Sequence, residues 1–247
     1  MSQLNDWPDS REHPDIAPNE VHIWRARLDC TEIIVQQLEE SLAADELARA
    51  DRYIFKPDRD SFVATRGILR QLLAKYVNHS PADLNFAYHQ HGKPYLVPQP
   101  SEPRIEFNIS HSQGLALLAF TLAREVGVDV EFVRPDLAGE EIAIRYFSSR
   151  EIDELRSLPA NSRVEGFFLC WTRKEAYIKA LGKGLQMPLT SFSVSLAPSQ
   201  PEHLDSADSS RWTLRSLTPA SGYLGAVVAE GKDLRLRCFD WQGNHEV

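Results

Sequence analysis

The chain has 247 residues, of which 43% are hydrophobic and 25% are charged, and its formal net charge is −8. This length allows one large domain or two modest ones with a buried core. The acidic balance argues against a nucleic-acid-binding protein, whose footprint is usually basic, and every apolar run is shorter than the roughly 20 residues that span a bilayer. We therefore expect a globular protein that binds neither nucleic acid nor membrane.

The N-terminus and the cysteines indicate the compartment. Residues 1–19 are polar and contain three prolines, which predicts a disordered tail. They have no basic segment followed by an apolar one, so a secretory signal is not expected. Cys30, Cys170 and Cys238 are scattered without metal-like spacing, which favours reduced thiols and a cytoplasmic location.

The apolar periodicity after this tail predicts strands, two helices and a strand pair in the first half. In chain order they are a strand over 21–28, helices over 39–52 and 60–76, a strand over 84–88, a Gly92-Lys93-Pro94 turn, and two strands within 104–121 flanking 110–114.

The second half starts again at Gly127. Its predicted elements are a strand over 128–133, helices over 140–146, 149–156 and 165–181, and strands over 192–196, 212–217, 223–229 and 234–240. Gly182 suits a left-handed cap at the end of the longest helix, and the Pro/Ser/Asp-rich segment 197–210 reads as a surface loop.

The two halves have the same order of elements. Val21 and Val128 are 107 positions apart, and so are Thr65-Arg66 and Thr172-Arg173. We therefore predict an α+β fold with a pseudo-two-fold duplication of a strand–helix–antiparallel-sheet unit. Its halves would be 20–123 and 124–247, with the active site in the cleft between them.

The first chemical motif is Gly127-Val128-Asp129-Val130-Glu131. Residues two apart on a strand share a face, so Asp129 and Glu131 point the same way. Two adjacent carboxylates repel unless a cation or solvent separates them, and Mg²⁺ uses one or two carboxylates together with water and phosphate oxygens. The motif is typical either of a metal site or of a half-buried strand with an acidic solvent face.

The second motif lies in the predicted helix over 165–181. Glu175 and Lys179 are four residues apart and so lie on one helical face. They could form a simple exposed ion pair. The helix is rich in large apolar residues, however, and a carboxylate beside a lysine is what a phosphoryl-transfer site needs.

The third motif is Phe107-Asn108-Ile109-Ser110-His111-Ser112. It brings short polar side chains and a histidine to a strand end, which suits phosphate oxygens, although Asn108 and Ser110 could also cap a turn. A serine hydrolase is not expected, because no Gly-x-Ser-x-Gly element between a strand and a helix accompanies the histidine.

These three motifs, in this order and at these separations, resemble the Sfp-type 4′-phosphopantetheinyl transferases, the surfactin synthetase activator family. The segment HGKPY at 91–95 is similar to that family's GKP turn, and Arg145-Tyr146-Phe147-Ser148 is similar to its RFFS segment. The similarity covers about residues 21–230. This family fuses in one chain two halves like the short holo-acyl-carrier-protein synthases, which agrees with the predicted repeat.

The resemblance implies an enzyme that transfers 4′-phosphopantetheine from coenzyme A to a serine of an apo acyl or peptidyl carrier protein and releases 3′,5′-ADP. Asp129, Glu131 and Glu175 would ligate Mg²⁺ with the coenzyme A pyrophosphate, and Glu131 would be the least essential. Lys179 would contact the attacked phosphate and stabilise the leaving group. Glu175 would be the general base, with Glu151 acting through a water as the alternative.

The resemblance also implies a coenzyme A site that draws on both halves. Asn108, Ser110 and His111 would line the phosphate and ribose side, Lys93 would meet the nucleotide end, and Arg49 and Arg66 would face the 3′-phosphate. Lys179 completes this set. For the carrier protein, the docking candidates are Lys174, Lys183 and Arg150.

Two other classes of function fit the same residues. One is a catalytically inactive module that binds coenzyme A or a carrier protein, but binding alone would not need three carboxylates. The other is a metal-dependent nucleotide phosphohydrolase. An internally duplicated enzyme has little need of an oligomer, so we expect a monomer.

Overall fold

The computed structural model describes residues 7–8, 15–99, 103–182 and 187–243. The first half consists of strands and helices in the order β1 (Glu20–Arg27), α1 (Glu32–Glu39), α2 (Ala44–Ala50), α3 (Lys56–Val77), β2 (Phe86–Tyr88), β3 (Pro94–Leu96), β4 (Ile105–Ser112) and β5 (Leu115–Leu122). β2 and β3 form a small hairpin, and β1 pairs antiparallel with β5, which pairs antiparallel with β4.

The second half contains β6 (Val126–Phe132), α4 (Glu140–Tyr146), α5 (Ser149–Ser157), α6 (Arg163–Leu181), β7 (Ser193–Val194), β8 (Leu204–Asp205), β9 (Trp212–Leu217), β10 (Tyr223–Glu230) and β11 (Arg235–Asp240). One sheet has the strand order β11-β1-β5-β4 and the other has the order β6-β10-β9. The two halves therefore pair their strands in the same way. In the first half, β1 pairs with β5, which pairs with β4; in the second half, β6 pairs with β10, which pairs with β9.

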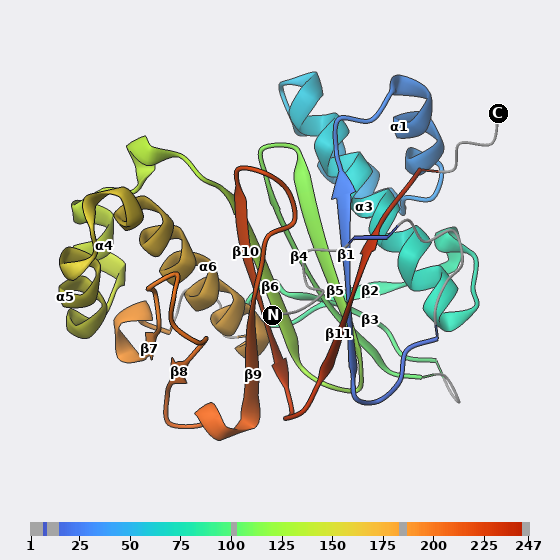
Figure 1. Ribbon diagram of the computed structural model, residues 1–247. Coiled ribbons are helices and arrows are strands. Elements are labelled where there is room, and N and C mark those ends of the chain that lie inside the picture. Colours follow the sequence, from blue (N-terminus) through green and yellow to red (C-terminus); the bar gives the residue numbers. More distant parts are fainter. Residues whose placement is uncertain (1–6, 9–14, 100–102, 183–186, 244–247) are drawn as a thin grey trace.

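The sheets lie between two groups of helices (Figure 1). α3 packs on one face of the four-stranded sheet, and α6 packs on one face of the three-stranded sheet. Alternate residues of β5 divide between two cores: Leu117 and Ala119 face the other sheet, whereas Leu118 and Phe120 face α3. This period of two is the ordinary consequence of the pleat.

The two sheets meet along β4 and β6. Asn108, Ser110 and Ser112 occupy alternate positions of β4, and each forms a side-chain hydrogen bond to a residue 19 or 20 positions later in β6. Because this offset is nearly constant, the two strands run in the same direction. We call this contact the β4–β6 seam. It joins the halves through polar side chains.

Most predicted elements are found within a few residues of their expected bounds, and two are not. The helix expected over 39–52 is shortened to α2, because Ser41 Oγ bonds back to Leu38 O and the Glu46 carboxylate accepts from Ala43 N, which starts the helix at Ala44; α1, which ends at Glu39, was not expected. The strand expected over 192–196 is reduced to β7, and β8 lies inside the expected loop 197–210.

The ends of the chain also differ from the expected boundaries. Trp7, in the segment expected to be disordered, is 7% exposed, and Pro8 O accepts a hydrogen bond from Asp240 N. β11, expected in the second half, pairs in parallel with β1 of the first half. The C-terminal strand therefore completes the N-terminal sheet.

None of the helices in the described ranges is long and apolar enough to cross a membrane. The three cysteines are free thiols, and Cys170 and Cys238 are buried.

A buried histidine links strand β1 to helix α3. His22 is fully buried, its Nδ1 lies 2.8 Å from Tyr76 Oη, and its Nε2 lies 3.2 Å from Glu20 Oε2. Burial lowers the pKa of His22 to about 4, and the Glu20 carboxylate offsets this only in part. The native state therefore holds His22 neutral at pH values where the unfolded chain, with a histidine pKa near 6.5, takes up a proton.

This difference predicts an acid-dependent loss of stability. The contribution of His22 is fully present above about pH 6.5 and is lost as the pH falls towards 4, since protons bind the unfolded state more tightly. Between pH 7.5 and pH 5 the loss from this residue is roughly 2 kcal/mol. Urea unfolding at both pH values measures it: His22→Gln should flatten the dependence, and His89→Gln, at an exposed position, should not. An unchanged pH dependence in His22→Gln would contradict the assignment.

Candidate active site

Strand β6 and helix α6 are in direct backbone contact at Gly127. A Cβ at this position would lie 2.1 Å from Ala176 O and 2.3 Å from Ala180 N. Only glycine therefore lets the strand approach the helix so closely. Because residues two apart share a face of a strand, Asp129 and Glu131 lie on the same side of β6 as Gly127, the side that faces α6.

Helix α6 presents Lys179 to Asp129 at this contact. Lys179 Nζ donates to Asp129 Oδ1 at 2.6 Å and to Ser110 Oγ at 3.0 Å, and Ser110 Oγ donates to the same carboxylate oxygen at 2.8 Å. Asp129 is 3% exposed, whereas the Lys179 side chain is 28% exposed. One ammonium group, one carboxylate and one hydroxyl from three elements thus meet at the β4–β6 seam, with the ammonium at the solvent side.

The other two predicted carboxylates lie beside this cluster. Glu131 Oε2 accepts from Ser112 Oγ at 2.8 Å. The pKa of Glu131 is raised by burial and by the Asp129 charge, although the Ser112 hydrogen bond lowers it. The pKa of Glu175 is raised to about 7, first by burial and then by Asp129, while Lys179 acts in the opposite direction. The three carboxylates therefore lie near enough to repel one another.

These carboxylates fit a metal ion that is shared with a substrate. Asp129 Oδ2 is buried and has no hydrogen-bond partner, which is costly for a charged oxygen. No three His, Cys, Asp or Glu side chains in the described ranges are grouped tightly enough to enclose a metal by themselves. Mg²⁺ does not need such a cage, since it keeps waters and takes further oxygens from phosphates.

The rest of the Phe107–Ser112 motif divides into two roles. Asn108 Oδ1 accepts from Val128 N at 2.9 Å, and the residue is 7% exposed, so this oxygen holds the seam together. His111 is exposed at the end of the motif, and partial burial of its ring and the Lys179 charge lower its pKa. A neutral imidazole therefore lies close to the ammonium of Lys179.

Lys93 of the Gly-Lys-Pro turn is also near this region. Its Nζ donates to Val126 O at 3.1 Å and lies 3.3 Å from Glu125 Oε2, which ties the turn to the start of β6. A Cβ placed on Gly182 would lie 3.8 Å from Lys93 Cδ. The turn thus lies beside the C-terminal end of α6, just beyond Lys179.

The predicted cations of the first half have other partners. Arg66 Nε donates to Glu46 Oε1 at 2.6 Å, and Arg70 Nε donates to the second oxygen of the same buried carboxylate at 2.6 Å. The exposed Arg49 lies over the ring of Phe62. Within the described ranges, neither Arg49 nor Arg66 bonds to the carboxylates of the seam, and the structure gives Arg66 a structural partner.

Two of the other candidates are buried behind the site. Lys174 is fully buried and donates to Leu189 O, Phe192 O and Glu151 Oε2 at 2.7 to 2.8 Å, so it cannot belong to a docking surface. Glu151 is equally buried and accepts from Ser148 N and Val194 N. It forms a buried ion pair with Lys174, which favours a structural role over that of a general base. Lys183 lies outside the described residues.

Sequence reasoning overlooked two residues. Ser112 holds Glu131 and also accepts from Phe132 N at 3.1 Å; its spacing of two from Ser110 was the available signal. Arg173 is 3% exposed and bonds to Ser195 and Ser216, which fixes α6 to its sheet. No pattern in the sequence distinguishes this arginine from an exposed one.

Comparison with known proteins finds one family match in each half of the chain. Residues 125–228 match the 4′-phosphopantetheinyl transferase superfamily, and residues 24–122 match the N-terminal region of 4′-phosphopantetheinyl transferases. The chain is 41% identical to the 4′-phosphopantetheinyl transferase HetI of Nostoc sp., over 91% of this chain and 90% of the relative.

The chain belongs to the 4′-phosphopantetheinyl transferase family. Its relatives in this family include Sfp of Bacillus subtilis, at 30% identity over 78% of this chain and 84% of that protein. Among solved structures, the holo-[acyl-carrier-protein] synthase of Thermotoga maritima covers 44% of this chain and 63% of its own, with 24% identity and a TM-score of 0.36. Membership of the family identifies the chain as a phosphopantetheinyl transferase enzyme.

The contact at Gly127 can be tested directly. Gly127→Ala should destabilise the protein by about 2–3 kcal/mol, because the added methyl group forces β6 away from α6. It should also lower the transfer rate. Gly139→Ala is the matched control, since a Cβ there meets nothing within 4 Å. Denaturant unfolding and a transfer assay measure both effects; wild-type stability in Gly127→Ala would show that the close contact is not needed.

Proposed function

We propose that this enzyme transfers the 4′-phosphopantetheine group of coenzyme A to a serine of an apo acyl or peptidyl carrier protein, releasing 3′,5′-ADP, in a reaction that requires Mg²⁺. The observation that carries the proposal is the cluster of Asp129, Glu131 and Glu175 beside Lys179, with one carboxylate oxygen left unpartnered. Such a cluster suits a substrate that brings phosphate oxygens and a bound cation.

Mg²⁺ held by these carboxylates would neutralise the pyrophosphate of coenzyme A and favour departure of the nucleotide. The serine oxygen attacks the phosphorus that carries pantetheine, the bond from that phosphorus to the bridging oxygen breaks, and the bridging oxygen leaves with its electron pair as part of 3′,5′-ADP. Lys179, already held in the seam, can turn an N–H towards the leaving phosphate.

Glu175 is the proposed general base. Without a bound cation the pKa of Glu175 is about 7; Mg²⁺ at the same site would lower it and keep the carboxylate ionised, so that it can accept the serine proton near neutral pH. Its position on α6, one turn before Lys179, supports this assignment, because both residues then face the same strand. Glu151, the alternative base, is held in a buried ion pair with Lys174.

The proposed coenzyme A site retains the residues inferred from the sequence. Ser110 and His111 lie next to Lys179, which supports a role at the phosphates. Lys93 beside the end of α6 supports a role at the nucleotide. For Arg49 and Arg66, contact with the 3′-phosphate stays a prediction, and Arg66 would have to leave Glu46 or share it.

The proposed architecture is a pseudo-two-fold duplication with the active site between the halves. The strand orders β1-β5-β4 and β6-β10-β9 support it. So do the paired positions in the long helices: Thr65 and Thr172 each bond back to the carbonyl four residues earlier, and Arg66 and Arg173 are both buried. The halves diverged in function, since only the second supplies the carboxylates.

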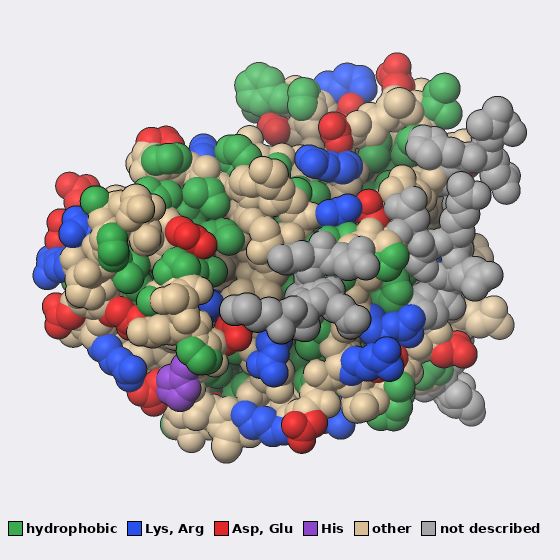
Figure 2. Space-filling model, in the orientation of Figure 1, with side chains coloured by type: hydrophobic (Ala, Val, Ile, Leu, Met, Phe, Trp, Pro, Cys, Tyr) green, Lys and Arg blue, Asp and Glu red, His purple; other side chains and the backbone are tan. Residues whose placement is uncertain are grey.

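The carrier protein would meet a surface of mixed charge. On the face shown in Figure 2, acidic and basic side chains alternate over α4 and α5. Arg150 of α5 has a side chain that is 65% exposed and remains a docking candidate. A monomer in the cytoplasm is part of the proposal.

A single incubation separates this proposal from its alternatives. The protein is incubated with coenzyme A, Mg²⁺ and an apo carrier protein, and the mass of the carrier is measured by mass spectrometry. A gain of one phosphopantetheine supports transfer. Cleavage of coenzyme A with an unmodified carrier would indicate a phosphohydrolase, and no change in either would indicate a binding module.

The role of Asp129 is tested by Asp129→Ala. This variant should lose transfer by at least about 100-fold, because the ion and Lys179 both lose their central carboxylate. It should still fold, and Mg²⁺ with coenzyme A should no longer raise its melting temperature. Asp136→Ala, at an exposed position, is the control. Near-normal turnover in Asp129→Ala would rule out the metal assignment.

For Lys179, the expected defect is in chemistry. Lys179→Ala should lower kcat by about 100-fold and change the affinity for the carrier protein little, since the ammonium acts on the phosphate. Lys75→Ala, exposed on α3, serves as the control. Steady-state kinetics separate kcat from KM; a loss confined to carrier affinity would place Lys179 in docking instead.

A further inference from the structure

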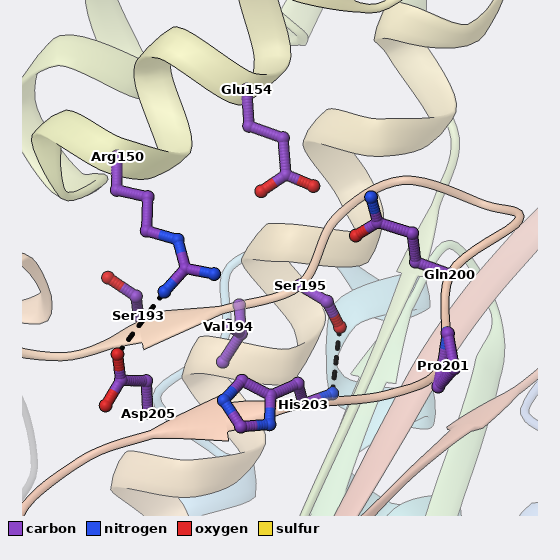
Figure 3. Close-up of a pocket in the computed structure, with 9 residues that line it drawn as sticks. All are labelled: Arg150, Glu154, Ser193, Val194, Ser195, Gln200, Pro201, His203 and Asp205. Carbon is purple, nitrogen blue, oxygen red and sulfur yellow. Dashed lines mark hydrogen bonds and ion pairs between the residues drawn. The ribbon is translucent and has the colours of Figure 1, made fainter.

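A second pocket lies apart from the acidic seam. It has a volume of about 280 Å³ and lies between α5 and the segment from β7 to β8 (Figure 3). Its lining residues are Arg150, Glu154, Ser193, Val194, Ser195, Gln200, Pro201, His203 and Asp205. None of them belongs to the carboxylate cluster or the coenzyme A residues of the proposed transfer site, and Arg150 is shared with the proposed docking surface. The pocket has room for several water molecules or for a small organic molecule.

Glu154 is the residue that singles out this pocket. Its carboxylate points from α5 into the pocket in Figure 3, and its Oε1 is buried without a hydrogen-bond partner. In the described ranges only one other carboxylate oxygen shares this condition, Asp129 Oδ2 in the transfer site. Because a buried carboxylate oxygen without a donor is costly, both positions favour a ligand that supplies one.

The other charged groups nearby do not supply that donor. Arg150 lies 3.4 Å from Asp205 and so pairs with another carboxylate of the lining. Arg173, buried behind Ser195, donates to the oxygens of Ser195 and to Ser216 Oγ. Within the described ranges, neither arginine makes a hydrogen bond to Glu154, although the charge of Arg173 lies near enough to interact with it.

The opposite rim supplies further polar contacts. The amide of Gln200 and the ring of His203 extend from the loop and from the chain entering β8 around the same space (Figure 3). Between these groups, Val194 and Pro201 give the pocket an apolar lining. A few polar groups around an apolar space are the usual form of a small-molecule site.

We propose that this pocket binds a small aliphatic amine, whose ammonium group is held by the Glu154 carboxylate and whose carbon chain lies against Val194 and Pro201. A protonated amine offers the N–H donors that Glu154 Oε1 lacks, and a charge-assisted hydrogen bond to a carboxylate is stronger than a neutral one. A short alkyl chain suits a pocket of this volume. This site is independent of the proposed transfer reaction.

Calorimetric titration of the full-length protein with cadaverine at low salt tests the proposal. We expect saturable binding at one site, no binding of pentane-1,5-diol, which has the same chain without the charges, and at least tenfold weaker cadaverine binding in Glu154→Gln. Glu165→Gln, an exposed glutamate of α6, is the matched control and should bind normally. Gln200→Trp, at an exposed rim position, should also weaken binding by filling the mouth of the pocket.

Three results would overturn the proposal. The first is no saturation up to about 10 mM cadaverine, a concentration on the order of the dissociation constants of the weakest specific complexes. The second is equal binding of the diol, and the third is unchanged binding in both Glu154→Gln and Gln200→Trp. The last result would mean that the amine binds elsewhere on the protein. Transfer to an apo carrier should be unaffected in Glu154→Gln, so this test succeeds or fails separately from the proposed function.

Discussion

The approach of α6 to β6 at Gly127 is the constraint on which the rest of the site depends. With no Cβ between them, the strand and helix bring Asp129 and Glu131 opposite Glu175 and Lys179. This packing crowds three carboxylates around one ammonium group and leaves Asp129 Oδ2 without a partner. The protein therefore holds unfavourable electrostatics in its folded state. Substrate phosphates with a bound cation would relieve them, which is the physical link between packing and the proposed activity.

The two faces of α6 show how one helix serves both stability and function. On the buried face, Lys174 has a partner for each of its three N–H groups, and its charge is matched by Glu151. Breaking such a buried pair costs several kcal/mol, so this face fixes the position of the helix. On the neighbouring face, Glu175 has a raised pKa because burial disfavours its charge and Asp129 repels it. Because the buried ion pair fixes the helix, Glu175 can stay in surroundings that raise its pKa.

Sequence periodicity was sufficient for most of the fold, since apolar residues at helical or alternating spacing report the face that is buried. It failed where a local side chain or a distant strand decided the outcome. The Glu46 carboxylate delays the start of the helix expected over 39–52 to Ala44, and it does so while also pairing with Arg66 and Arg70 of α3. β11 pairs with β1 of the other half. This pairing depends on the edge that β1 offers in the N-terminal sheet and not on the residues of β11 alone.

For the site, the sequence by itself determined the chemical groups and their pairing within each element: Asp129 with Glu131 by the period of a strand, and Glu175 with Lys179 by the period of a helix. It also determined the family, through three motifs in order. Only the tertiary structure decided which of these pairs face each other, that Asn108 and Ser112 serve the seam, and that Lys174 and Glu151 are buried. These facts depend on burial and on contacts between residues far apart in the chain, and neither quantity is a property of a local pattern.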